Sequence, residues 1–206
     1  MSKMLTTDNY EKNTVGASLR KFSFLQRFLI DNFNKILISE VKKLKPSSIL
    51  DAGCGEGFTL KRLKDAGIGK KLEGFDYLDR AVKLGAKQYP GLNIKKGDIY
   101  KINSKANSFD VVICSEVLEH LERPEDAIRE LIRVSKRYLV LSVPQEPLFM
   151  LGNLLRGKNV RRFGNDIEHI NHWSNGSFVK FVSKHLKVKQ NITPLPWTLL
   201  VAEKKM

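Results

Sequence analysis

Residues 49–57 read Ile-Leu-Asp-Ala-Gly-Cys-Gly-Glu-Gly, and this stretch decides the fold of the chain. An apolar run ends in an acid, Asp51, and glycines follow at positions 53, 55 and 57. The pattern predicts a strand that runs into a tight loop without side chains, where the backbone can approach a nucleotide-like ligand closely. The stretch therefore favours a cofactor-binding α/β enzyme.

Strand-like and helix-like segments alternate on the carboxyl side of this loop. Strands are predicted at 48–51, 72–76, 92–95, 109–114, 138–143, 187–192 and 197–203, and helices at 59–66, 78–88, 124–135 and 174–185. Strands that are separated by helices of about ten residues indicate a mostly parallel sheet with both faces covered. We therefore predict an α/β fold, a three-layer sandwich.

A long amphipathic helix is predicted ahead of the first strand. Its apolar residues recur at helical spacing: Phe22, Leu25, Leu29, Phe33, Ile36, Leu37, Val41 and Leu44. Packing on the chain's own core is favoured, while docking to a membrane surface or a partner stays open. We expect residues 1–44 to form an N-terminal segment with a cap helix and residues 45–206 to form the main domain.

Residues 145–166 have no clear period and contain three glycines and two arginine clusters. The segment is longer than an ordinary connection, which predicts a lid or a binding loop. We expect residues 145–173 to form an insertion on the acceptor side of the site. Four basic residues crowd this loop, at positions 156, 158, 161 and 162.

The composition indicates one globular domain in 206 residues, of which 42% are hydrophobic. Cys54 and Cys114 lie in apolar, strand-like contexts, so we expect neither a disulfide framework nor a cysteine zinc site, and a reducing, cytoplasmic compartment fits best. We expect no signal peptide and no membrane span. The net charge of +14 could favour nucleic acid or anionic lipid, but most basic residues are scattered and favour a solvated surface.

Three signals for a bound cofactor follow three successive predicted strands. The first is the glycine loop, the second is Asp76 with its neighbour Tyr77, and the third is Asp98 with Ile99. An acid at the end of the second strand can accept hydrogen bonds from ribose hydroxyls, and an acid beside an apolar residue could bind a purine. Each signal is weak alone, but together and in this order they strongly indicate a nucleoside cofactor.

A nicotinamide dinucleotide is disfavoured by the spacing of the loop. Phe58 occupies the place of the third glycine of the dinucleotide fingerprint. The carboxylates of Asp51 and Glu56 would repel a pyrophosphate at a helix N-terminus. A cationic ligand suits the loop better, such as a sulfonium that carries an amino-acid ammonium group.

Residues 45–203 resemble the class I S-adenosylmethionine-dependent methyltransferases, most closely the small stand-alone group that includes the ubiquinone-biosynthesis O-methyltransferases. Residues 51–57 look like motif I of that family, Asp76 like the ribose acid, and Asp98-Ile99 like the adenine contact. Residues 108–121, Ser-Phe-Asp-Val-Val-Ile-Cys-Ser-Glu-Val-Leu-Glu-His-Leu, look like its fourth-strand motif, with Ser115 under the cofactor. The resemblance implies S-adenosylmethionine as cofactor and a seven-stranded sheet whose last strand is antiparallel.

Methyl transfer from a sulfonium mainly requires alignment, because the leaving group is already activated. A hydroxyl or protonated amine as acceptor also needs a base, for which His120, His169 and His172 are candidates because histidine titrates near neutral pH. Each histidine could equally have a packing role. We expect transfer to an oxygen or nitrogen atom of a small molecule, while a non-catalytic cofactor-binding module is disfavoured.

The alternative acceptor is RNA. Residues 116–120 followed by His169 and His172 resemble the metal-binding pattern of the small-RNA 3′-end 2′-O-methyltransferases. That resemblance implies Glu116, Glu119, His120 and His169 as ligands of a divalent ion, Mg²⁺ or Mn²⁺. The basic loop would suit a phosphate backbone. The sequence identifies neither the acceptor nor the oligomeric state.

Overall fold

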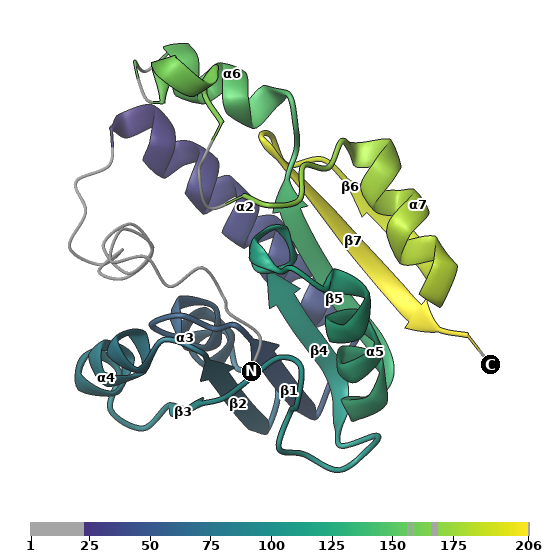
Figure 1. Ribbon diagram of the computed structural model, residues 1–206. Coiled ribbons are helices and arrows are strands. Elements are labelled where there is room, and N and C mark those ends of the chain that lie inside the picture. Colours follow the sequence, from purple (N-terminus) through teal and green to yellow (C-terminus); the bar gives the residue numbers. More distant parts are fainter. Residues whose placement is uncertain (1–22, 156, 158, 166–168, 206) are drawn as a thin grey trace.

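The computed structural model describes residues 23–155, 157, 159–165 and 169–205, and these residues contain one seven-stranded sheet (Figure 1). The strands are β1 Ser48–Ala52, β2 Lys71–Asp76, β3 Asn93–Lys96, β4 Phe109–Ser115, β5 Ser135–Pro144, β6 Leu186–Ile192 and β7 Trp197–Lys204. Their order in the sheet is β3-β2-β1-β4-β5-β7-β6. β7 pairs antiparallel with both neighbours, and the other pairs are parallel. The predicted fold class, including the antiparallel last strand, is confirmed.

The helices are α2 Phe24–Lys43, α3 Phe58–Asp65, α4 Asp79–Gln88, α5 Pro124–Val134, α6 Leu148–Leu155 and α7 Asn175–His185, with short 3₁₀ turns η2 Leu118–His120 and η3 Val160–Arg162. Local signals explain several of their starts. Ser23 and Gln26 form a capping box ahead of α2, and the Ser174 side chain caps α7. All these helices except α6 agree with the sequence within one or two residues at each end.

The segment 145–166 was expected to be a loop, and α6 corrects that expectation. Its sequence, Leu-Phe-Met-Leu-Gly-Asn-Leu-Leu, is apolar on nearly every side of the helix. Such a helix has no polar face, so it shows no 3.6-residue alternation. Residues 156, 158 and 166–168 lie outside the described part, so two of the four basic residues expected in this loop, Arg156 and Lys158, are among those not described.

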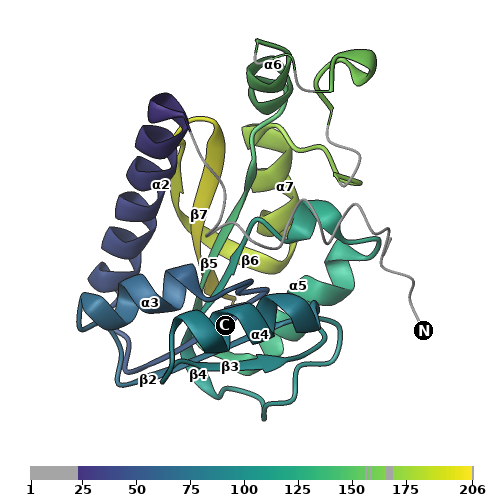
Figure 2. The same ribbon diagram turned by 90° about the vertical axis from the view of Figure 1, so that its left-hand side faces the viewer.

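The two faces of the sheet form separate cores because successive strand residues point to opposite sides. On one face, Phe33, Leu37 and Val41 of α2 and Leu63 of α3 pack on a cluster that includes Ile49 and Val111. On the other face, α5 and α7 pack on a cluster that includes Leu50 and Val112. Figure 2 shows the sheet between these two helical layers. Cys54 and Cys114 are buried free thiols.

The amphipathic stripe of α2 is buried only over its C-terminal half. Leu37 and Val41 are fully buried. In the N-terminal half, Leu25 is 64% exposed, and its large apolar neighbours Phe24 and Phe28 are 88% and 60% exposed. The N-terminal half of α2 lies at the same end of the molecule as α6, beyond the cover of the sheet (Figures 1 and 2). Phe22 lies outside the described residues. None of the helices in the described part combines the length and apolar character needed to cross a bilayer.

Candidate active site

The sheet order reverses between β1 and β4, and the candidate site lies at the carboxyl ends of these strands. β2 and β3 continue the sheet on one side, and β5 continues it on the other. The loops that leave β1 and β4 therefore diverge and open a crevice, which is where open α/β sheets bind ligands. The glycine loop follows β1, and residues 116–121 follow β4.

The glycine loop is held tightly against the end of β2. The backbone N–H groups of Gly53 and Cys54 both donate to the Phe75 carbonyl oxygen, at 2.9 Å each. Gly57 caps α3 with φ of 85°, and a Cβ atom there would collide with the Ile94 side chain. A side chain at this position would be excluded by both its backbone conformation and its neighbour. The glycine loop is therefore fixed at both ends, by the end of β2 and by the start of α3.

Asp76 connects the tip of β2 to this loop. Its Oδ2 accepts from the Gly55 N–H and its Oδ1 from the Leu78 N–H, each at 2.8 Å. Burial raises the pKa of the Asp76 carboxyl, although these backbone donors oppose the rise. The Tyr77 N–H also donates to this carboxylate, and the hydroxyls of a ribose would use its remaining acceptor capacity. Tyr77, the next residue, is 38% exposed.

Asp51 is the buried acid of the site, with 2% of its surface exposed. Its Oδ2 has no hydrogen-bond partner among the described residues. Burial, with a further contribution from the Asp76 charge, raises the pKa of Asp51 to about 7. A cationic hydrogen-bond donor would satisfy the oxygen and relieve the repulsion between the two acids. The pair therefore fits the ammonium and sulfonium groups expected from the sequence.

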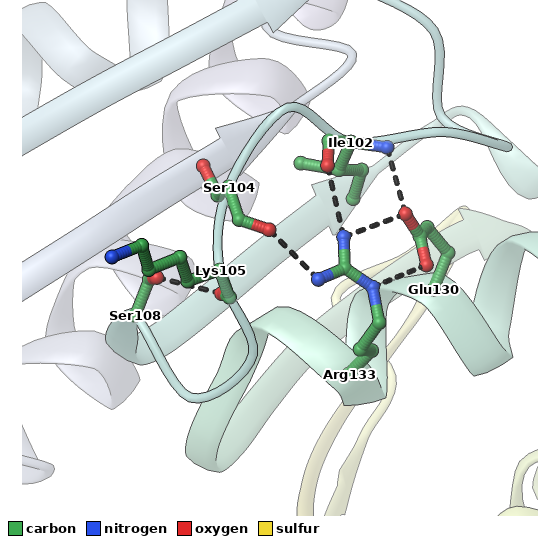
Figure 3. Close-up of polar contacts among 6 residues, drawn as sticks. All are labelled: Ile102, Ser104, Lys105, Ser108, Glu130 and Arg133. Atoms are coloured by element: carbon green, nitrogen blue, oxygen red, sulfur yellow. Dashed lines mark hydrogen bonds and ion pairs between the residues drawn. The ribbon is translucent and has the colours of Figure 1, made fainter.

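The loop that carries Asp98 is fixed from α5, as Figure 3 shows. The Arg133 guanidinium donates to the carbonyl oxygens of Ile102 and Ser104, at 2.9 and 2.7 Å, and Glu130 accepts from the Ile102 N–H. Asp98 itself accepts from the Tyr100 N–H. These two helix residues were not singled out in the sequence.

Two residues that were expected to contact the cofactor, Ile99 and Ser115, also contact other parts of the protein. Ile99 is 5% exposed and belongs to the core cluster under α5. The Ser115 hydroxyl lies 2.8 Å from the Ser142 hydroxyl. Their roles toward the cofactor stay predictions, as do those of the other candidate residues.

Three of the expected metal or base residues meet beyond β4. Glu119, His120 and His169 each have a ligand-type atom, and these atoms lie within 4.8 Å of one another. Asn171 brings the two segments together, since its side chain donates to the carbonyl oxygens of Leu118 and Leu121. The backbone N–H groups of Ile170 and Asn171 also donate to the Glu119 carbonyl oxygen. Burial and the nearby Glu116 charge raise the pKa of the Glu119 carboxyl.

Glu146 joins the same cluster and was missed in the sequence. Its Oε1 lies 3.8 Å from Nδ1 of His169 and 3.9 Å from Nδ1 of His172. His172 is the most exposed of the three histidines and lies outside the group of potential metal ligands among the described residues. No spacing rule links residue 146 to residues 169 and 172, because a helix and a loop separate them.

Glu116 lies apart from this group. Its Oε1 accepts a hydrogen bond from the Ser142 hydroxyl at 2.9 Å, and the Trp197 side chain also bonds to it. Glu116 lines a cavity of about 540 Å³. The cavity is lined by Arg27, Ile30, Asp31, Phe33, Asn34, Phe58, Arg62, Glu116, Phe149 and Trp197. Its lining residues come from both halves of the crevice, since Phe58 follows the glycine loop and Glu116 follows β4.

Comparisons with known proteins identify the family that part of this chain matches. Residues 50–140 match the family described as "Methyltransferase domain". The ubiquinone biosynthesis O-methyltransferase of Coxiella burnetii is 31% identical over 135 residues, 58% of this chain and 57% of the relative. The norajmaline N-methyltransferase of Rauvolfia serpentina is 36% identical over 98 residues, 44% of this chain and 33% of the relative. The chain therefore spans about half or less of these relatives' length.

Solved structures show the same fold. The crystal structure of magnesium protoporphyrin IX methyltransferase from Synechocystis PCC 6803 with bound SAH has a TM-score of 0.71 to this chain at 19% identity. The match covers 99% of this chain and 100% of that chain.

Proposed function

This chain belongs to the class I S-adenosylmethionine-dependent methyltransferases, and we propose that it transfers a methyl group to an oxygen or nitrogen atom of a small-molecule acceptor. The observation that carries the proposal is the cavity of about 540 Å³ beside the glycine loop. This volume lies in the range of small-molecule pockets. One of the two relatives named above is an O-methyltransferase and the other an N-methyltransferase, which supports both acceptor atoms.

S-adenosylmethionine supplies an activated methyl group, so the residues of the chain mainly have to align the reactants. Asp51 would bind the ammonium end of the cofactor, and Asp76 would bind its ribose. The N-terminal helix and residues 145–173 would frame the acceptor, because Phe33 and Phe149 line the cavity from these segments. His169 packs at a tilted angle against Phe149, with ring centroids 5.2 Å apart, so its imidazole contacts a residue of the cavity lining and is the proposed base.

The cofactor assignment is tested by calorimetry with S-adenosylhomocysteine. We expect a dissociation constant in the micromolar range for the wild-type protein and a large loss on Asp76→Ala. Absence of binding by the wild-type protein would falsify the proposed function. A screen of hydroxyl and amine compounds for release of S-adenosylhomocysteine then identifies the acceptor atom.

The second candidate function is metal-assisted methyl transfer to RNA, which the cluster of Glu119, His120 and His169 favours. Two imidazoles and a carboxylate could bind Mn²⁺ or Mg²⁺, although the ligand types alone do not select the ion. Calorimetric Mn²⁺ binding should be lost in His169→Ala and kept in His185→Ala, a histidine at the end of α7. RNA binding with a steep log–log salt dependence would support this alternative. Indifference of Mn²⁺ binding to His169→Ala would exclude this metal site.

A cytoplasmic location is proposed on chemical grounds. Both cysteines are free and buried, and burial raises the pKa of the Cys114 thiol. Such thiols are unreactive packing residues, which is the usual state of cysteines in a reducing compartment.

A further inference from the structure

The end of the molecule that carries α6 exposes most of the large apolar side chains found on the surface. Of the eleven large apolar residues that are exposed in the described part, eight lie on the N-terminal half of α2, on α6 and around η3. The eight residues are Phe24, Leu25, Phe28, Leu148, Leu151, Leu155, Val160 and Phe163. Apolar residues that are exposed singly are common on proteins, whereas a group gathered at one end marks an interaction surface.

These three elements belong to one surface, which we call the apolar end. The N-terminal half of α2 and α6 lie at the same end of the molecule in both views (Figures 1 and 2), and Arg27 of α2 lines the same cavity as Phe149 of α6. η3 is held against α6, because the Asn153 side chain donates to the Gly164 carbonyl oxygen at 2.9 Å. The apolar end therefore adjoins the cavity of about 540 Å³.

The sequence of the apolar end is basic throughout. The eight apolar residues fall within residues 23–30 and 147–165, which contain five basic residues and no aspartate or glutamate. Arg27 and Arg161 are exposed. The other three basic residues are Arg156, Lys158 and Arg162, whose side chains lie outside the described part.

The described acids next to these ranges do not offset this charge. Glu146 is buried, and the Asp31 carboxylate lies 3.7 Å from the Arg62 guanidinium. The apolar end is thus complementary to a surface that is apolar in its interior and negatively charged at its boundary.

A second copy of this chain does not meet that requirement. A twofold interface places the same surface on both subunits, so the five positive charges of one copy would face the same five of the other. RNA supplies the negative charge, but its bases bind to aromatic side chains by stacking. Five of the eight exposed apolar residues are leucine or valine, which offer no ring for a base.

We propose that the apolar end binds the surface of an anionic lipid bilayer. The apolar side chains enter the boundary between headgroups and acyl chains, and the basic side chains contact the anionic headgroups. This mode of binding needs no helix that crosses the bilayer, in agreement with the helices of the described part. It would place the cavity beside the bilayer, and it does not depend on which molecule accepts the methyl group.

The test is sedimentation of the full chain with lipid vesicles, made either of phosphatidylglycerol, which is anionic, or of phosphatidylcholine, which has no net charge. Each lysine or arginine near an anionic surface strengthens binding about fivefold. The two exposed arginines therefore predict at least about 25-fold tighter binding to phosphatidylglycerol. Raising the salt concentration to about 0.5 M should weaken this binding strongly, because the charges are then screened.

Variants separate the apolar contribution from the charge. The double variant Leu151→Gln with Leu155→Gln removes two exposed apolar side chains, and we expect about 30-fold weaker binding to phosphatidylglycerol vesicles. Because both side chains are exposed, the double variant should unfold at the same urea concentration as the wild-type protein, which separates loss of binding from loss of folding.

Arg161→Gln should weaken binding to phosphatidylglycerol about fivefold. The matched control is Arg80→Gln, at an exposed residue of α4, which lies at the opposite end of the molecule from α6 (Figures 1 and 2). We expect this control to change the affinity less than about 1.5-fold, because its charge is far from the bilayer by more than the screening length.

Three results would overturn the inference. The first is equal or no binding of the wild-type protein to the two kinds of vesicle. The second is binding to phosphatidylglycerol that the double leucine variant keeps, or that Arg161→Gln and Arg80→Gln weaken equally, since either would reflect the overall positive charge of the chain. The third is absence of vesicle binding together with a dimer, or a complex with single-stranded RNA, that the leucine variant loses. Calorimetry with S-adenosylhomocysteine tests the proposed function separately, so each proposal can fail without the other.

Discussion

The two sides of the crevice between β1 and β4 are built by different means. On the proposed cofactor side, glycine-loop N–H groups donate to the Asp76 carboxylate and to the Phe75 carbonyl oxygen at the end of β2. On the proposed acceptor side, α2 and α6 contribute large apolar residues that are mostly exposed, with Phe24 88% and Leu155 80% exposed. The proposed cofactor side is thus built from consecutive strands and loops, and the proposed acceptor side from segments distant in sequence.

This difference explains where recognition of the two reactants is encoded. A cofactor shared across a family can be bound by a fixed loop and two acids. An acceptor that differs between members requires a surface that can change without disturbing the sheet. Helices packed at the end of the sheet meet that need, because their substitutions do not alter the strand register.

The largest expected effect is on the cofactor side. Asp76→Ala removes the carboxylate that would bind the ribose, and we expect the affinity for S-adenosylhomocysteine to fall about 1000-fold, or about 4 kcal/mol for two hydrogen bonds to a charged group. Calorimetry measures the loss. Asp79→Ala, at the exposed start of α4, is the matched control and should change the affinity less than about twofold. Equal losses in the two variants would contradict the role of Asp76.

The second prediction concerns the buried charge of Asp51. Its folded-state pKa of about 7 is above the ordinary value of an aspartate, so the folded protein binds the proton more tightly than the unfolded chain does. The penalty on stability therefore develops as pH rises from about 4 to about 7 and is constant above. Asp51→Asn removes it, and we expect a gain on the order of 3 kcal/mol at pH 8.

Urea unfolding of the cofactor-free protein measures this gain, which should vanish near pH 4. The same variant should bind S-adenosylhomocysteine more weakly, because the ammonium group loses its carboxylate. An Asp51→Asn variant that is less stable than the wild-type protein at pH 8 would show that the ionised acid has a partner that stabilises it.

The third prediction tests how the acceptor side is assembled. Asn171→Ala removes two side-chain hydrogen bonds to the turn at residues 118–121 and leaves partly buried carbonyl oxygens without them. We expect a loss of about 2 kcal/mol in the free energy of unfolding. Asn191→Ala, which breaks an exposed side-chain pair with Asn175, should cost less than about 0.5 kcal/mol. Similar costs for both variants would mean that Asn171 does not connect the two segments.

The smallest effect is expected at the exposed end of α2. Phe28→Ala, at a residue that is 60% exposed, should change the free energy of unfolding by less than about 0.5 kcal/mol. Phe33→Ala, one and a half turns further along and 6% exposed, should cost about 3 kcal/mol. Urea unfolding of the pair measures both values. A large loss from Phe28→Ala would indicate that this residue packs against another part of the protein.

The sequence predicted the elements that have a strong local signal. The strands and the helices that pack on them show clear periods and caps, as at Ser174 ahead of α7, and all were located within a few residues. α6 was missed because an apolar helix has no period. Packing of the whole apolar stripe of α2 on the core was favoured over docking to a membrane surface or a partner, because the apolar spacing continues to Leu25, but that residue is 64% exposed.

The residues of the candidate site also divide into those with a local sequence signal and those without one. Asp51, Asp76 and Asp98 are found in the sequence because each lies at or just beyond the end of a strand, and strand ends meet at one edge of a parallel sheet. Glu146 and Trp197 carry no such signal. Each becomes part of the site only because β5, β7 and the segment before α7 converge there, as shown by the hydrogen bond from the Glu146 N–H to the Trp173 carbonyl oxygen.

The sequence by itself determined the α/β fold and the resemblance to a methyltransferase family, and it predicted the place of the cofactor, because these depend on residues a few positions apart whose backbone conformations are set locally. Only the tertiary structure decided that Ser142 and Trp197 bond to Glu116 beside a cavity with aromatic walls, whereas Glu119 joins His120 and His169. The physical reason is that a side chain at the end of a strand finds its partners on segments that are distant in the sequence, and the packing of those segments decides which partners it meets. Neighbouring residues such as Glu116 and Glu119 can therefore face different sites, although their spacing groups them together.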